Sequence, residues 1–136
     1  DDRRFAKVIN FGLIYGMGSY RISQELEISR KDAKKFIENY FAQFPTVRNY
    51  LDSCISKAKK DGFVSTIFGR KLYLPELKSS NKMRVKEAER VAVNMPIQGS
   101  AADIIKIAMV KIHGKIKETA DIKMIIQVHD ELVFEI

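Results

Sequence analysis

The chain has 136 residues, of which 46% are hydrophobic, so it is long enough to enclose one core and too apolar to be disordered. No apolar run approaches the length that spans a membrane. The net charge of +7 is compatible with a polyanionic partner such as nucleic acid, and the single cysteine, Cys54, excludes an internal disulfide.

The two ends of the chain predict that it is a segment of a longer cytoplasmic protein. The chain begins with the charged residues DDRRFAK, without an initiating Met or the apolar core of a secretion signal. It stops within an apolar strand pattern, where an unpaired edge would favour aggregation. A lone cysteine also fits a reducing compartment.

Hydrophobic periodicity and turn residues predict an α+β chain that is mostly helical. Helices are expected at residues 2–15, 19–27, 30–43, 46–60 and 82–94, and from Gln98 or Gly99 to about 118, after a break at Pro96. The stretch GFVSTIFGRKLYLPEL predicts a hairpin that turns near Gly69-Arg70. The last helix is expected to be core, because seven apolar residues repeat along it at helical spacing: Ala101, Ile104, Ile105, Ala108, Met109, Ile112 and Ile116.

Two cations and two aromatic residues follow one another every four positions along the first helix. These are Arg3, Lys7, Phe11 and Tyr15, and they form one stripe on the helix surface. The cations could neutralise a polyphosphate, and Phe11 could stack on a planar base. The competing interpretation is that the cations are solvated and Phe11 packs against a neighbouring element.

Polar residues repeat in the same way before Pro96. Lys86, Arg90 and Asn94 are four positions apart, and Gln98 lies one step further. Side chains of this kind reach the phosphates, sugars and groove edges of a nucleic-acid duplex. The competing interpretation is an ordinary exposed helix face.

The stretch IIQVHDELVFEI closes the chain and places His129, Asp130 and Glu131 between two apolar runs. This pattern predicts a β-hairpin whose tip carries the three polar residues. Two carboxylates fit Mg²⁺, which prefers oxygen ligands, and the competing interpretation is a solvated acidic turn. The other histidine, His113, is expected to be structural or exposed, and the sequence contains no glycine-rich phosphate loop and no C-x-x-C motif.

Four segments together resemble the DNA polymerase I family, or family A. RRFAKVINFGLIYG is similar to the nucleotide-binding signature R-x-x-x-K-x-x-x-F-x-x-x-Y-G, and all its positions match. QVHDELVFE resembles the metal-binding hairpin of the family's palm subdomain. FGRKLYLPELKSSN and ERVAVNMPIQGSAADIIK also resemble stretches of the bacterial members, so that the resemblance covers essentially the whole chain.

The resemblance implies part of a right-hand polymerase fold. Residues 1–93 would be the fingers subdomain, with a β-hairpin near 62–75, and residues 94–136 would be a partial palm. The implied activity is template-directed addition of dNTPs to a primer 3′-hydroxyl, in DNA replication or repair. Its implied partners are primer–template DNA, dNTPs and the rest of the polymerase chain, and no membrane is implied.

The resemblance also implies roles for the residues of the first helix. Arg3 and Lys7 would bind the triphosphate of the incoming nucleotide, and Lys7 would assist catalysis. Phe11 would stack on the base and sugar, and a Phe at this position implies discrimination against sugars without a 3′-hydroxyl. Tyr15 would pack beside the nascent base pair.

Further roles implied by the resemblance concern the DNA and the metal ions. Arg90, Asn94 and Gln98 would contact the primer–template, and His129 would lie near the primer end. Asp130 would bind two Mg²⁺ ions with assistance from Glu131, and both carboxylates would be catalytic.

One part of the family pattern is missing from this chain. The family's second metal-binding aspartate lies in a D-x-S-x-x-E segment, which does not occur here, so a carboxylate ligand is expected outside this chain. The fragment alone is therefore expected to be inactive. The alternatives are a degenerate DNA- or nucleotide-binding module without catalysis and a basic structural protein.

Overall fold

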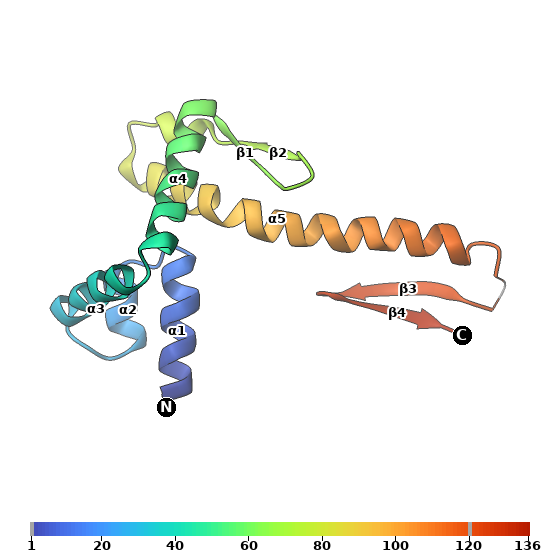
Figure 1. The fold of residues 1–136 in the computed structure, drawn as a ribbon, viewed down its shortest axis with the longest axis horizontal. Helices are drawn as coiled ribbons and strands as arrows, with labels where there is room; N and C mark the ends of the chain where they lie inside the picture. The colour runs from blue at the N-terminus through green and yellow to red at the C-terminus, as the bar shows by residue number, and fades with distance from the viewer. Residues whose placement is uncertain (1, 120) are drawn as a thin grey trace.

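The computed structural model describes residues 2–119 and 121–136. The first half of the chain forms the helices α1 (Asp2–Ile14), α2 (Ser19–Glu25), α3 (Arg30–Gln43) and α4 (Pro45–Asp61). A hairpin of β1 (Phe63–Ser65) and β2 (Lys71–Tyr73), the 3₁₀ helix η1 (Pro75–Lys78) and the long α5 (Lys82–Ile116) follow. A second hairpin, β3 (Lys123–Val128) and β4 (Glu131–Glu135), ends the chain. The predicted mostly helical α+β class is confirmed (Figure 1).

The predicted helix boundaries agree with the structure where the sequence contains capping residues. Oγ of Ser29 accepts the N–H of Asp32 at 3.0 Å and so caps the first turn of α3. Oδ1 of Asn81 accepts the N–H of Met83 at 2.9 Å at the start of α5. Gly62 ends α4 with a φ of 77°, a left-handed conformation that glycine adopts without strain.

The first three helices enclose a small core of their own. Leu13 of α1 packs with Ile22 of α2, with Leu26 directly after α2 and with Ala33 of α3, and all four are buried. This core holds α1 so that its opposite side faces solvent.

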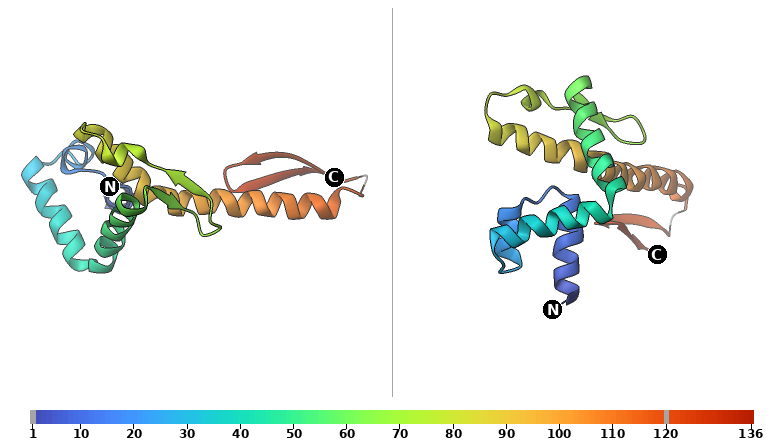
Figure 2. Two further views of the ribbon diagram at one scale, coloured as in Figure 1. Left: turned by 90° about the horizontal axis from the view of Figure 1, so that it is seen from above. Right: turned by 60° about the vertical axis from the view of Figure 1, so that its left-hand side comes forward.

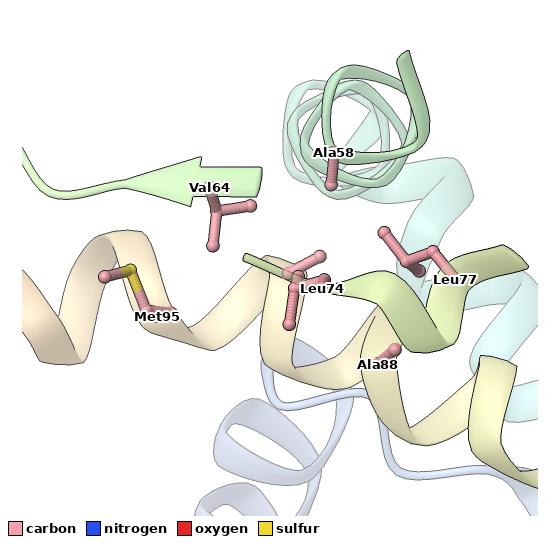
Figure 3. Close-up of a cluster of buried hydrophobic side chains, with 7 residues drawn as sticks. Ala58, Val64, Leu74, Leu77, Ala88 and Met95 are labelled. Atoms are coloured by element: carbon pink, nitrogen blue, oxygen red, sulfur yellow. The ribbon is translucent and has the colours of Figure 1, made fainter. Parts of the chain in front are cut away.

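A second core joins α4, the β1–β2 hairpin, η1 and the first half of α5 (Figure 3). Ala58 and Ala88 have no large side chain, so that α4, η1 and α5 approach closely around Leu77. The buried residues of this core are Ala58, Val64, Leu74, Leu77, Ala88, Ala92 and Met95.

The predicted break at Pro96 is wrong, because α5 continues through Pro96 as one helix of 35 residues. Proline removes one backbone hydrogen bond and its ring crowds the preceding turn, which normally kinks or ends a helix. Here Val93 and Met95 are buried before the proline, and Ser100 is buried after it. Burial on both sides of Pro96 maintains the helix where local propensity alone would end it.

The predicted core character of the second half of α5 is also wrong. Ala101 and Ile104 are exposed, the latter at 53%, and the remaining residues of that apolar stripe are only half-buried. The turn of the β1–β2 hairpin touches the start of this half of the helix, and in Figures 1 and 2 the β3–β4 hairpin lies beside the rest of it, so the stripe has little surface to pack against. Despite the length of α5, no described helix is long and apolar enough to cross a membrane.

We expect Leu77→Ala to lower the free energy of unfolding by about 2–5 kcal/mol, because it leaves a cavity between α4 and α5. Leu77 is 8% exposed, whereas Leu72 on β2 is 40% exposed and provides a matched control. Leu72→Ala should cost about 1 kcal/mol or less. Urea denaturation followed by circular dichroism measures both values, and equal losses would contradict the assignment of this core.

Candidate functional site

The predicted stripe on α1 faces solvent. Arg3 and Lys7 are exposed, and neither forms an ion pair with another residue in the described part of the chain. Phe11 is 55% exposed and Tyr15 is 36% exposed. Their rings stack at an interplanar angle of 14° with their centres 6.3 Å apart. The exposed cations agree with the first part of the competing interpretation, whereas the half-exposed ring of Phe11 does not support the second part, its packing against a neighbouring element.

The C-terminal end of this stripe meets the polar face of α5. Tyr15 lines a hollow of about 530 Å³ together with Arg90, Asn94 and Gln98. Behind these polar residues Ala88 and Ala92 are buried in the second core, which fixes the rotation of α5. Two residue sets that the sequence placed on separate helices therefore form one concave surface.

Gly16 makes this approach of α1 to α5 possible. Its φ is 76°, in the left-handed region, and a Cβ built on it would lie 3.0 Å from Cγ of Arg90. A side chain at this position would have to push Arg90 aside, and without one the backbone after α1 rests on the aliphatic part of Arg90. The arginine is thereby held beside Tyr15.

Sequence reasoning missed four residues that line the hollow, Glu87, Val91, Met95 and Gly99. Glu87 lies three positions before Arg90, so the helical spacing of the polar face was a signal that could have included it. Gly99 carries no such signal, because its place in the wall depends on the continuation of α5 past Pro96. Lys86, which the sequence placed on the same face, does not line the hollow.

The predicted hairpin at the end of the chain is present, with a shorter tip than expected. Val128 pairs with Glu131, so the turn consists of His129 and Asp130, and Glu131 is the first residue of β4. His129 has a φ of 54°, and its carbonyl oxygen accepts Nε2–H of Gln127 at 2.9 Å. The three polar residues of the tip are all exposed.

The hairpin tip does not line the hollow beside Tyr15. In Figures 1 and 2 the β3–β4 hairpin runs alongside α5, and its tip points back toward the end of the molecule that carries α1. The stripe of α1, the polar face of α5 and the hairpin tip are therefore three separate polar surfaces, of which the first two adjoin.

The hairpin tip offers part of a metal site. Asp130 and Glu131 provide oxygen ligands, which suit Mg²⁺, and they are adjacent at a rigid strand end. Among the described residues no group of three or more His, Cys, Asp or Glu comes together that could hold a metal ion. The two carboxylates therefore fit such an ion as a partial ligand set. His113 lies exposed in the last turn of α5, away from these ligands in sequence.

Comparisons with known protein sequences agree with one another. The family model described as DNA polymerase family A matches residues 1–136. DNA polymerase I of Pseudomonas aeruginosa is 49% identical over an alignment that covers 100% of this chain and 15% of that protein. The thermostable DNA polymerase I of Thermus aquaticus is 48% identical, with 98% of this chain and 16% of that protein covered.

A solved structure is similar over almost the whole chain. It is described as the POL domain of Pol1 from M. smegmatis in complex with DNA primer–template and dNTP. The TM-score is 0.89 at 49% sequence identity, and the match covers 98% of this chain and 24% of that chain. The chain thus spans only 15–16% of the length of the curated relatives it matches.

We expect Gly16→Ala to destabilise the protein more than Gly62→Ala does. The two glycines have φ values of 76° and 77°, but nothing lies within 4 Å of a Cβ at Gly62. The shared left-handed conformation should cost each variant about 1 kcal/mol. Gly16→Ala should cost about 1–3 kcal/mol more, because Arg90 must move. Urea denaturation of the matched pair gives the difference, and a difference near zero would contradict the close approach.

Proposed function

The chain belongs to DNA polymerase family A, and from this premise we propose that it forms the fingers (residues 1–93) and part of the palm (94–136) of a DNA-directed DNA polymerase. The whole protein would add dNTPs to a primer 3′-hydroxyl under the direction of a template, in DNA replication or repair in the cytoplasm. The observation that carries the proposal is the hollow in which Tyr15, the residue after α1, adjoins Arg90, Asn94 and Gln98 of α5.

The exposed stripe of α1 suits an incoming nucleotide. Arg3 and Lys7 would neutralise its triphosphate, the first as a planar fork and the second as a point charge. Phe11 would stack on the base and sugar, as its half-exposed ring permits. Lys7 would also offset the negative charge that develops on the phosphates during transfer, which is its catalytic role. Tyr15 would pack against the nascent pair at the end of the stripe.

The polar face of α5 suits the primer–template duplex. Asn94 and Gln98 carry amides that donate and accept hydrogen bonds, as contacts to the minor-groove edges of bases require. Arg90 would bind the backbone, and its position beside Gly16 would keep it next to the nascent base pair. His129 at the hairpin tip would lie near the primer end.

Asp130 would hold Mg²⁺ with assistance from Glu131. When bound, the metal ions make the primer 3′-hydroxyl a better nucleophile and offset the charge of the leaving pyrophosphate. The β3–β4 hairpin would supply the rigidity that keeps the two carboxylates in place. A further carboxylate ligand would come from the rest of the protein, together with the remaining palm and the thumb, so the 136-residue chain alone would be inactive.

We expect Asp130→Ala to abolish single-nucleotide primer extension by the full-length protein in Mg²⁺, because a principal metal ligand is lost. Removal of such a ligand should lower the extension rate by at least about 10³-fold. Binding of primer–template DNA, measured by fluorescence anisotropy, should change little, since α5 is intact.

The matched control is Asp121→Ala, which removes an exposed carboxylate before β3 and should leave extension unaltered. Extension by Asp130→Ala near the level of the unaltered protein would reject the metal assignment. DNA binding without any extension by the unaltered protein would favour the binding-module alternative. Extension by the 136-residue chain itself would reject the proposal that the site is completed elsewhere.

We expect Phe11→Tyr to ease the incorporation of dideoxynucleotides by the full-length protein. The added hydroxyl would lie beside the sugar and compensate for the missing 3′-hydroxyl, which the Phe ring does not do. The ratio of kcat/KM for a dNTP to that for its dideoxy analogue should fall by on the order of 100-fold. An unchanged ratio would argue against a contact between Phe11 and the nucleotide sugar.

A further inference from the structure

One arginine attaches the turn of the β1–β2 hairpin to α5. Nε of Arg70 lies 2.7 Å from Oδ1 of Asp103, and its Nη2 donates to the carbonyl oxygen of Gly99 at 3.1 Å. The N–H of Ile67 in the same hairpin turn donates to Oγ of Ser100 at 3.0 Å. A planar guanidinium that binds two groups at once fixes their orientation as well as their distance. Arg70 therefore holds the turn of α5 between residues 99 and 103 against the hairpin.

Asp103 is the charged partner in this attachment. It is only 8% exposed, and burial would raise its pKa. The side chain of Thr66 and then the Arg70 guanidinium outweigh that effect and hold the pKa of Asp103 below its ordinary value, with a contribution from Lys106. Oγ1 of Thr66 also accepts the N–H of Arg70 at 3.2 Å. The hairpin turn and the helix thus share one polar cluster.

The attached turn follows the weakest point of α5. Pro96 has no N–H, so the carbonyl oxygen of Ala92 lacks its helical donor. The hydroxyl of Ser100 donates to the carbonyl oxygen of Pro96, a contact that tends to bend helices. Gln98 lies between the proline and the attached turn, and it lines the hollow together with its neighbour Gly99. Its direction therefore depends on how the helix is held on the far side of Pro96.

We propose that Arg70, with Asp103 as its partner, is a positioning residue for Gln98. The guanidinium fixes the turn of α5 after Pro96 and so sets the direction in which Gln98 faces the primer–template. This inference rests on the proposed function, because it requires that Gln98 contacts the duplex. Arg70 is not among the residues that line the hollow and acts through the helix.

The test variant must keep the charge of Arg70, because its side chain is 51% exposed whereas that of Asp103 is only 11% exposed. Removal of the cation would leave a buried carboxylate unpaired and would lower stability as well as orientation. Arg70→Lys keeps the charge and loses the fork, so it removes orientation selectively. Lys71→Ala is the matched control, because this neighbouring cation lies 4.5 Å from the centre of the Phe63 ring rather than against α5.

The test is single-nucleotide primer extension by the full-length protein with Arg70→Lys, Gln98→Ala, the double variant and Lys71→Ala. Arg70→Lys should lower kcat/KM for the primer–template roughly tenfold to a hundredfold. The KM for the dNTP should stay unchanged, because the stripe of α1 is not affected. Lys71→Ala should match the unaltered protein, and the melting temperatures of all variants should agree.

The double variant separates positioning from a general effect on the protein. If Arg70 acts through Gln98, Arg70→Lys should cost almost nothing further once Gln98 is alanine. If the losses of kcat/KM in the two single variants multiply in the double variant, the inference is overturned and the polymerase function stays in place. The same holds if a fall in melting temperature accounts for the loss of kcat/KM in Arg70→Lys. A normal rate for Gln98→Ala would overturn the inference as well. Failure of the unaltered full-length protein to extend a primer would instead overturn the proposed function.

Discussion

The candidate site depends on the close approach of the end of α1 to the side of α5. Each helix belongs to a different core, α1 to the one around Ile22 and α5 to the one around Leu77. The two core clusters have no buried residue in common, and Gly16 lets the end of α1 rest directly on the aliphatic part of Arg90 of α5. Because of that contact, the stripe of cations and aromatic rings along α1 ends at Tyr15, beside the amides of Asn94 and Gln98 on α5. A bulkier residue at this point would displace Arg90, because a Cβ there would lie 3.0 Å from Cγ of Arg90.

Local elements of this fold could be predicted from the sequence because the relevant signals are local. Capping by Ser29 and Asn81 and the left-handed Gly62 all act within one turn of chain. The two wrong predictions both concern α5, where tertiary contacts decide whether the helix continues and whether its apolar side is buried. Burial around Pro96 overrides the helix-breaking effect of proline, and the apolar stripe that includes Ile104 stays exposed because burial requires a second surface. Periodicity indicates which side of a helix is apolar but not what will cover it.

The residues of the candidate site could be predicted better than their arrangement. Polar and aromatic residues that recur every four positions identified Tyr15 at the end of α1 and Asn94 on α5. This was possible because the residues on one helix face follow from the sequence of that helix alone. The hollow that joins them depends on how two cores pack, which no short stretch encodes. The turn at His129 shows the same limit on a smaller scale. The apolar flanks predicted a hairpin, but the pairing of Val128 with Glu131 set its register and moved Glu131 into a strand.

Because Pro96 lies within α5, a small bend at the proline would move the far end of that helix by a large distance. Residues 97–116 extend beyond the proline, and at the usual rise per residue they form an arm of about 30 Å. A bend of about 5° at the proline would move the far end of such an arm by roughly 2.5 Å, which is more than the length of a metal–oxygen bond. The chain then reverses into the β3–β4 hairpin, whose tip points back along the arm. The angle of one proline-containing turn therefore governs how far the amide of Asn94, which precedes the proline, stands from the carboxylates of the hairpin.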